Sequence, residues 1–416
     1  MKIKLPFQNM SAESWQNLGL AALCLFYALQ ICFDLFWRNI CGHLAIDYCS
    51  FWSAGYLANL KGYVAIYNLS LMHDIQKEIF PKLIAVTPTP FLPVFVIPFQ
   101  LLALLHPSLS FWVWTFLNLA ILVLYLLFFS VKLTGRAISS RLLLMLLLSV
   151  PTFINVFTGQ VNVWLVICAG EFIRAMMTER PFQAGLWLGG FLLKPQILIL
   201  IAPALLIQRA IKTLAGLTIS SSILIGTSIA LAGTDGLKNL FDLWLGYAGG
   251  LPTNDIEIMM NWRMIGLHLS TFTPPLFAWT IAGIGLLTTA TATLYLWHRR
   301  IEPDSPSFII ALLGTLAATG TVAWHSHVHM AMILIPSMAY LLEQNLLPSR
   351  ILNLWVFLPA SIYVLVIILA SLVQVAILPP GFDPLLNFLR GAVEFGLNLW
   401  LLFWAIKKST QIYRKR

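Results

Sequence analysis

Apolar residues occur in long continuous stretches along most of the chain, and short polar segments separate them. A run of about twenty apolar residues is long enough to cross the hydrocarbon core of a bilayer as an α-helix. The pattern therefore predicts an all-α, polytopic membrane protein with about twelve transmembrane helices. The expected spans lie at residues 17–37, 90–106, 109–131, 141–157, 161–177, 183–207, 212–232, 275–297, 308–324, 328–343, 352–377 and 386–406.

Two connections between these spans are long, residues 38–89 and residues 233–274. In the first, apolar and polar residues mix with helical spacing from Asp47 to Lys61, which is typical of an amphipathic helix lying in the membrane interface. Gly62 is expected to end this helix, and a second short helix is expected from Leu69 to Phe80, where Pro81 stops it. We therefore expect two interfacial helices in the first outer loop.

The composition supports a membrane protein and excludes other classes. Hydrophobic residues make up 59% of the 416 residues and charged residues 10%, with a mean hydropathy of +0.85, whereas a soluble domain carries roughly 25% charged residues. Disorder requires low hydrophobicity, and a β-barrel requires alternating segments of about ten residues. The prediction is a single membrane domain over residues 1–416: a first span at 17–37, an outer loop at 38–89, spans two to seven at 90–232, a second outer loop at 233–274, spans eight to twelve at 275–406 and a basic cytoplasmic tail at 407–416.

The net charge of +9 indicates topology and contact with anionic lipid rather than nucleic-acid binding, because basic residues gather at the ends of apolar spans. Counting back from the tail places most basic loops on one side, which we expect to be cytoplasmic. Both long connections are then extracytoplasmic. By this count five cations fall on the outer side: Lys132, Arg136, Arg141, Arg174 and Arg180. Either a span between residues 90 and 207 is miscounted, or these cations act outside.

Two charged positions are candidates for chemistry. Asp47 is either the N-cap of its helix, a role worth about 1 kcal/mol, or a general base whose pKa apolar neighbours raise, and both roles can coexist. Lys194 precedes Pro195 inside an apolar span, and a lysine at that depth should face protein or water. It is either a snorkelling residue at a kink or a cation that lines a cavity for an anionic head group.

Three further features leave alternatives open. His325, His327 and His329 occupy alternate positions at the end of a span. They are either interfacial residues without a chemical role, zinc ligands that need a further ligand, or hydrogen-bonding and proton-transfer groups at a cavity. Two pairs with helical spacing are expected to be ion pairs, Glu171 with Arg174 and Arg390 with Glu394. Two cysteines, Cys41 and Cys49, could pair if the first loop is extracytoplasmic.

A series of short motifs follows in order along the chain: Asp47-Tyr48, Phe51-Trp52-Ser53-Ala54-Gly55, Gly62, Tyr67, the proline-rich Pro90 to Pro98, Gly159-Gln160-Val161-Asn162, Lys194-Pro195-Gln196, Asn261-Trp262-Arg263, and Trp324-His325 to Pro336. Together they resemble the motifs of the family-87 glycosyltransferases, which are polyprenyl-phosphate-mannose-dependent mannosyltransferases with the GT-C membrane fold. The resemblance covers roughly residues 15 to 340. The chain departs from the family pattern at Thr87–Phe91 and at Arg263, which replaces a serine.

The resemblance implies a GT-C-type fold and a membrane glycosyltransferase. Such an enzyme moves a sugar, mannose or another hexose, from a polyprenyl-phosphate carrier to a lipid or glycan acceptor at the outer face of a bacterial cytoplasmic membrane. It inverts configuration, and Asp47 maps onto the family's general base; His325 and His327 are further catalytic candidates. The residues expected to bind the donor phosphate are Gln160, Asn162, Lys194 and Arg263. Those expected to line the substrate site are Tyr48, Trp52 and Asn261.

No metal or other cofactor is expected, because too few carboxylates gather in the outer loops to hold a hard divalent cation. The expected partners are the polyprenyl-phosphate sugar, the acceptor and membrane lipids, with no nucleic acid. A transporter or flippase of a lipid-linked sugar is the alternative, since it would explain Lys194 and Glu171 within apolar spans. A non-catalytic scaffold would leave Asp47 unexplained.

Overall fold

The computed structural model describes residues 11–37, 40–41, 44–80, 87–249, 256–375, 377 and 382–414, and this part of the chain is helical, with no strand. Two of the bent helices, α6 (Ser140–Leu147) and α7 (Val150–Thr158), form a pair bent by 55° that is long enough to cross a membrane once. Six single helices are also long and apolar enough: α1 (Ala12–Trp37), α5 (Pro107–Thr134), α11 (Ile211–Gly249), α13 (Pro275–Leu296), α16 (Ser349–Gln374) and α17 (Asp383–Arg414). The chain is therefore a multi-pass membrane protein.

The expected twelve spans are not reproduced within the described residues, because several of the apolar stretches are short or broken. The stretch expected at 90–106 forms only η2 (Pro93–Val96) and α4 (Ile97–Leu102). Ten helical residues extend roughly 15 Å, which is about half the thickness of the hydrocarbon core. These two elements instead pack against α2 (Ile46–Lys61) and α11.

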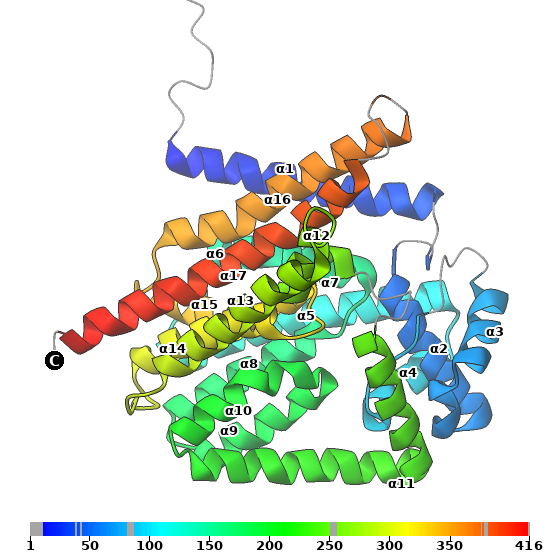
Figure 1. Ribbon diagram of the computed structural model, residues 1–416, viewed down its shortest axis with the longest axis horizontal. Helices are drawn as coiled ribbons and strands as arrows, with labels where there is room; N and C mark the ends of the chain where they lie inside the picture. Colours follow the sequence, from blue (N-terminus) through cyan, green and yellow to red (C-terminus); the bar gives the residue numbers. More distant parts are fainter. Residues whose placement is uncertain are drawn as a thin grey trace, which may run out of the picture.

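The stretch expected to be one span at 183–207 turns back at its middle. It forms α9 (Pro181–Leu188), η3 (Gly189–Leu193), η4 (Pro195–Ile197) and α10 (Leu198–Ile207). Pro195 lacks the N–H of a continuous helix, and the helical path breaks at Lys194. Gly185 of α9 lies directly against Thr213 near the start of α11, and α10 ends just before α11 begins. The segment therefore enters and leaves at the same end of the molecule (Figure 1).

A second broken segment lies opposite the first. It consists of α14 (Pro306–Val322), the non-helical residues 323–327, η6 (Val328–Leu334) and α15 (Ile335–Glu343). Ser130 Oγ donates a hydrogen bond of 2.6 Å to Glu343 Oε1, so α15 finishes beside the end of α5. Between α7 and α9, the helix α8 (Asn162–Met177) packs against α5, α9 and η6.

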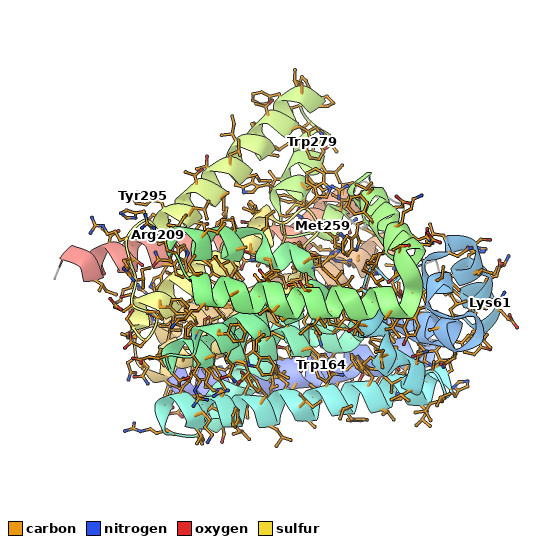
Figure 2. The ribbon with its side chains drawn as sticks, turned by 90° about the horizontal axis from the view of Figure 1, so that it is seen from below. Lys61, Trp164, Arg209, Met259, Trp279 and Tyr295 are labelled. Carbon is orange, nitrogen blue, oxygen red and sulfur yellow. A yellow bond between two sulfur atoms is a disulfide. The ribbon has the colours of Figure 1, made fainter. Side chains whose placement is uncertain are left out.

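The turns that carry most cations lie together at one end of the molecule, on the left in Figures 1 and 2. We call it the basic end; it comprises the turns 134–140, 178–181, 207–211, 297–306 and 343–349 and the end of α17. Arg209 and Tyr295 lie close together there, whereas Lys61 lies at the opposite end (Figure 2). Gln208 Nε2 ties two of these turns by donating to the carbonyls of Trp297 (2.5 Å) and Arg299 (2.7 Å).

The conflict over the five cations is resolved by this arrangement. Lys132, Arg136, Arg141, Arg174 and Arg180 lie in or beside the turns of the basic end. The count of spans put these five cations on the outer side because it treated residues 183–207 as one crossing. Since that segment turns back, it adds no crossing, and the cations fall on the same side as the other basic turns. The miscounted span, rather than a separate function for these cations, explains the discrepancy.

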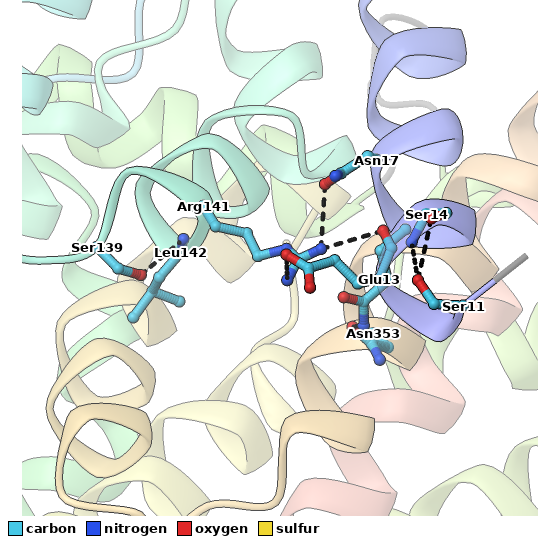
Figure 3. A network of polar contacts seen from close by, with 9 residues as sticks. Ser11, Glu13, Ser14, Asn17, Ser139, Arg141, Leu142 and Asn353 are labelled. Atoms are coloured by element: carbon cyan, nitrogen blue, oxygen red, sulfur yellow. Dashed lines mark hydrogen bonds and ion pairs between the residues drawn. The ribbon is translucent and has the colours of Figure 1, made fainter.

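Polar contacts fix the first half of α1 to the bundle (Figure 3). Arg141 of α6 donates to the Glu13 carboxylate (3.1 Å), the Glu13 carbonyl (3.1 Å) and Asn17 Oδ1 (3.0 Å). Gln16 Nε2 donates to Asn353 Oδ1 of α16 (3.0 Å). The ring of Tyr27 stacks on that of Phe153 with centroids 3.9 Å apart, and beyond this point α1 forms part of a cavity wall.

The first long connection is helical, as expected, but more deeply packed. It contains α2, η1 (Tyr63–Tyr67) and α3 (Leu69–Ile79), and Gly62 ends α2 with a φ of 81°. Pro81, expected to stop the second helix, lies outside the described residues. Most residues of α2 are buried, so it is not an amphipathic surface helix, whereas α3 has an exposed polar face. Cys41 and Cys49 form a disulfide, with Cα atoms 5.9 Å apart.

The second long connection is also largely helical. The helix α11 continues beyond Gly233, where the backbone kinks at a φ of 68°, and its last part packs against η1 and η2. After the gap in the described residues come η5 (Ile256–Ile258) and α12 (Trp262–Leu269). The expected loop at 233–274 therefore adds a helical wall beside α2.

Candidate active site

A cavity of about 1090 Å³ lies away from the basic end, where the broken segments meet α2. Its walls come from α1, the start of α2, residues 87–91, the end of α7, the two helix breaks at 193–196 and 324–330, and the inner parts of α16 and α17. Most of the lining surface is apolar, and polar and charged side chains interrupt it. A large apolar cavity with a small set of polar side chains is the usual form of a ligand site.

Asp47 lines this cavity from the first turn of α2. It is not the N-cap: that position is Ala45, and no side chain caps the helix. The polar side chains nearest to the Asp47 carboxylate are Gln160, Thr158 and Lys194. Burial raises the pKa of Asp47, while Gln160, Thr158 and the charge of Lys194 act in the opposite direction. Asp47 thus faces a polar group of the cavity rather than capping its helix.

The turn after α7 places both partners of Asp47. Gly159 has a φ of 74°, a conformation that favours glycine, and a Cβ there would lie 2.5 Å from the Cβ of Tyr48. Trp114 Nε1 donates to the Gly159 carbonyl (3.0 Å). The Ala45 N–H donates to the Phe157 carbonyl (2.8 Å), which joins the start of α2 to the last turn of α7. The backbone itself therefore holds the two elements in register.

Lys194 connects Asp47's partner to the histidines. Its Nζ lies 3.0 Å from Gln160 Oε1 and 3.2 Å from His329 Nε2. Because Gln160 Oε1 accepts from the ammonium, the amide N–H₂ of the same side chain points toward Asp47. A continuous polar chain, Asp47–Gln160–Lys194–His329, thus runs from α2 across the first helix break to the second.

His325 and His327 line the cavity beside this chain. Their ring centroids are 4.8 Å apart, and His327 and His329 are 5.8 Å apart. Gln196 Nε2 donates to the His325 carbonyl (3.3 Å) and ties the two breaks together. Burial, helped by nearby positive charge from Lys194, lowers the pKa of His325 to about 4 and that of His327 well below its usual value. Both rings are therefore neutral at neutral pH. Among the described residues, no group of three or more His, Cys, Asp or Glu could hold a metal ion.

Five other predicted site residues support the cavity from behind rather than line it. Tyr48 Oη pairs with Ser110 Oγ (2.5 Å), and Trp52 Nε1 donates to the Leu105 carbonyl (3.2 Å). Asn162 bonds Asn155 Oδ1 through its backbone N–H (3.1 Å) and side chain (3.0 Å) at the start of α8.

The remaining two, Asn261 and Arg263, shape the second break. Asn261 Nδ2 donates to the carbonyls of Ala323 (2.9 Å) and Trp324 (3.1 Å), and its Oδ1 caps α12 by accepting from the Met264 N–H (3.0 Å). The Arg263 guanidinium lies 4.5 Å from the centroid of the Trp324 ring, a cation–π contact. These residues hold the backbone from which His325 projects.

Among the polar residues that line the cavity close to Asp47 and Lys194, Thr158 and Gln196 were not predicted as site residues, and His329 was considered with the other two histidines but given no role. Each one has a sequence neighbour that was predicted, namely Gln160, Lys194 and His327. The available signal was proximity to a helix-breaking residue, Gly159 or Pro195, because the chain on both sides of a break is exposed to the same cavity.

The fold and the site define a multi-pass membrane protein whose buried carboxylate, lysine and histidines share one lipid-sized cavity. The sequence model of glycosyltransferase family 87 matches residues 90–323, more than half of the chain. The chain therefore belongs to glycosyltransferase family 87. The matched range includes Gln160 and Lys194 and ends before His325, and Asp47 precedes it. No curated protein and no solved structure matches the chain.

Proposed function

We propose that this membrane glycosyltransferase transfers a hexose, mannose being the first candidate, from a polyprenyl-phosphate carrier to a hydroxyl of a lipid or glycan acceptor. The observation that carries the proposal is the polar chain Asp47–Gln160–Lys194–His329 inside a mostly apolar cavity. It offers a proton acceptor and a cation in one site, beside walls suited to an isoprenoid chain.

Asp47 acts as the general base. The acceptor O–H gives its proton to the Asp47 carboxylate while the hydroxyl oxygen attacks the anomeric carbon of the donor sugar. The bond between that carbon and the phosphate oxygen breaks, its electron pair leaves with the phosphate, and configuration inverts. The raised pKa of Asp47 suits this role, because a base works best when its pKa is close to the operating pH.

Lys194 receives the leaving phosphate. An ammonium has three N–H donors, and Gln160 and His329 take two of them. The third is available for a phosphate oxygen, whose charge grows as the glycosidic bond breaks. His325 and His327, as neutral rings, each supply one N–H donor for the phosphate or the sugar.

The lipid chains reach this site from the side. Leu29 and Phe33 on the second half of α1 line the cavity and are 59% and 50% exposed. An opening bordered by exposed apolar side chains lets an isoprenoid tail stay in the bilayer while its phosphate enters.

Two features favour an active site on the extracytoplasmic side. The cations of the basic end mark a cytoplasmic end by the positive-inside rule. The disulfide between Cys41 and Cys49, which lies just before Asp47, belongs to an oxidising compartment. We therefore place the cavity on the outer face of a cytoplasmic membrane.

Asp47→Asn tests the function directly. Purified wild-type and variant proteins in lipid vesicles are given polyprenyl-phosphate hexoses and a membrane lipid extract, and glycosylated products are measured by mass spectrometry. The variant should lose transfer by 10²–10⁴-fold, the usual contribution of a general base. Asp74→Asn, an exposed carboxylate on α3, is the control and should keep wild-type rates.

Two results would contradict the proposal. One is transfer within about threefold of wild type in a folded Asp47→Asn protein. The other is movement of labelled polyprenyl-phosphate sugar across the vesicle membrane without any glycosylated product, which would instead establish a transporter.

A further inference from the structure

Glu394 is a buried carboxylate that the proposed reaction does not use. It lies on α17, is 1% exposed and lines the same cavity as Asp47. Neither of its carboxylate oxygens has a hydrogen-bond partner among the described residues. The ion pair expected with Arg390, one turn earlier, is not formed, whereas Glu171 and Arg174 do form theirs at 2.5 Å. A buried acceptor without a partner costs about 1–3 kcal/mol or more, so it calls for a ligand.

Other polar groups share this wall of the cavity. Arg390 lines it, and its Nε is also buried without a hydrogen-bond partner in the part of the chain that the structure describes. Tyr363 of α16 and Gln30 of α1 line it from the facing helices, and Gln30 donates to Asp34 (2.5 Å). A separate polar subsite thus lies between α1, α16 and α17, on elements other than those that hold Lys194 and the histidines.

The charges of this subsite restrict its ligand. An anion would be repelled by Glu394, and a cation by Arg390. A neutral polyol satisfies both, because its hydroxyls donate to the carboxylate and accept from the guanidinium. Hydrogen bonds to charged groups are the stronger ones, worth about 1.5–3 kcal/mol.

We propose that Glu394 and Arg390 bind the uncharged, hydroxyl-rich head group of the acceptor. The inference rests on the proposed function, because it divides one cavity between two substrates. The donor phosphate fits the wall with Lys194, and it would be disfavoured beside Glu394. The two polar walls share the apolar surface of Ile154, Phe157 and Val393, against which both lipid-borne substrates can lie.

Binding of defined amphiphiles tests the subsite without turnover. The probes are octyl α-mannoside, octyl phosphate and octyltrimethylammonium, which share a tail and differ in head group. Binding to the purified protein in nanodiscs is followed by competition and by thermal shift. Glu394→Met should weaken mannoside binding by roughly tenfold to a hundredfold, the equivalent of one hydrogen bond to a charged group, and should not weaken binding of octyl phosphate, which fits the wall with Lys194.

The matched control is Glu171→Gln, a buried carboxylate that does not line the cavity, which should leave mannoside binding unchanged. If Glu394→Met does not fold, Glu394→Gln, which keeps an acceptor oxygen and loses the charge, should give a smaller loss. The thermal stability of the ligand-free Glu394 variants should not fall, because no protein partner is lost. Equal mannoside binding in wild type and both variants, an equal loss of octyl phosphate binding in Glu394→Met, or tighter binding of octyltrimethylammonium than of the mannoside would overturn the proposal.

The kinetics separate this inference from the proposed function. Glu394→Met should raise KM for the acceptor at least tenfold and leave KM for the polyprenyl-phosphate sugar within about twofold. Asp47→Asn should still bind the mannoside. If mannoside binding weakens in the Glu394 variants as expected, but the wild type transfers no sugar from any polyprenyl-phosphate hexose, the result would contradict the proposed donor only. If Asp47→Asn loses transfer while the Glu394 variants keep normal mannoside binding and acceptor KM, the result would contradict the subsite only.

Discussion

At the scale of single residues, Lys194 is a buried cation that lines the cavity. Its hydrogen-bond partners, Gln160 and His329, are uncharged, and Asp47 is the carboxylate whose charge acts on it. A central lysine costs about 2.5–3.5 kcal/mol on the insertion scale, and an anionic ligand offsets that cost. Lys194→Met should therefore preserve expression and raise KM for the polyprenyl-phosphate sugar at least tenfold.

Initial rates at varied donor concentration give this KM, and Lys61→Met, an exposed lysine at the end of α2, is the control. His325→Ala and His327→Ala should lower turnover, at least one of them by more than tenfold. An unchanged KM for the donor in Lys194→Met would show that the Lys194 side chain only extends its ammonium toward water and does not bind the donor.

The pKa of Asp47 sets an expected pH dependence. A general base works only when deprotonated, and burial raises this pKa above the ordinary value of 3.8. Transfer should therefore fall as the pH is lowered through the raised pKa, at a higher pH than an ordinary aspartate would show. The measurement is kcat/KM against pH, and the residual rate of Asp47→Asn should lack this acid limb. A wild-type rate that stays level down to about pH 4 would exclude Asp47 as the base.

The same shift has a consequence for stability. A carboxyl group whose pKa is higher in the folded state stabilises the fold at low pH, and this contribution is lost as the pH rises through the folded pKa. At neutral pH, Asp47→Asn should therefore leave Tm unchanged or raise it. Loss of activity in this variant will not reflect unfolding.

Sequence reasoning identified several residues that line the cavity but not the orientation of every predicted side chain. Asp47, Lys194 and His325 were predicted and line the cavity, since a charged or titratable group in apolar surroundings is rare enough to stand out. Asn162 and Asn261 were predicted for the same site and bond the backbone or a neighbouring amide behind it. Amides serve equally well as caps and as ligands to substrate, and one sequence does not give the direction in which such a side chain points.

At the scale of elements, the turn at Gly159 positions the base. A Cβ at this residue would meet Tyr48, and the backbone has a φ of 74°. Gly159→Ala should lower both Tm and transfer, because Thr158 and Gln160 would move away from Asp47. Gly135 has a φ of 73° with open space around it, so Gly135→Ala carries the same backbone strain of about 1–3 kcal/mol without the collision.

Circular dichroism melting and transfer rates, measured on both variants, separate the effect of the collision with Tyr48 from that of the backbone strain. Equal losses of transfer in the two variants would show that contact with Tyr48 does not matter. A larger loss in Gly159→Ala is the expected result.

At the level of helices, the predicted number of membrane crossings, twelve, was not confirmed. Hydropathy predicts a span at residues 183–207 and another at residues 90–106. The helices at 183–207 are interrupted at Lys194-Pro195, and those at 90–106 are too short to cross a membrane. A broken apolar segment and a continuous one have the same composition, so only the lysine and proline at its centre distinguish them. The two short helices of the first connection lie at the expected residues, and Gly62, which ends the first one, is a local signal, but α2 is buried rather than interfacial.

At the scale of the whole molecule, the basic end and the cavity end should face opposite sides of the membrane. In a protein with Cys24, Cys32 and Cys168 replaced by serine, Lys61→Cys and Arg209→Cys place single thiols at the two ends. A membrane-impermeant maleimide added to intact cells should label the first and not the second until the membrane is opened. The reverse pattern would place the cavity in the cytoplasm and contradict the proposed orientation.

The exposed wall formed by Leu29 and Phe33 also determines how the enzyme experiences its substrates. Under the proposed function, donor and acceptor enter the cavity beside α1 from the surrounding lipid, so encounters would take place in two dimensions, by lateral diffusion within one leaflet. The relevant concentration is then the mole fraction of donor and acceptor in that leaflet, and adding inert phospholipid should slow transfer at constant bulk amounts. A cell can thus regulate this reaction by changing the crowding and composition of its membrane, with no change in the protein.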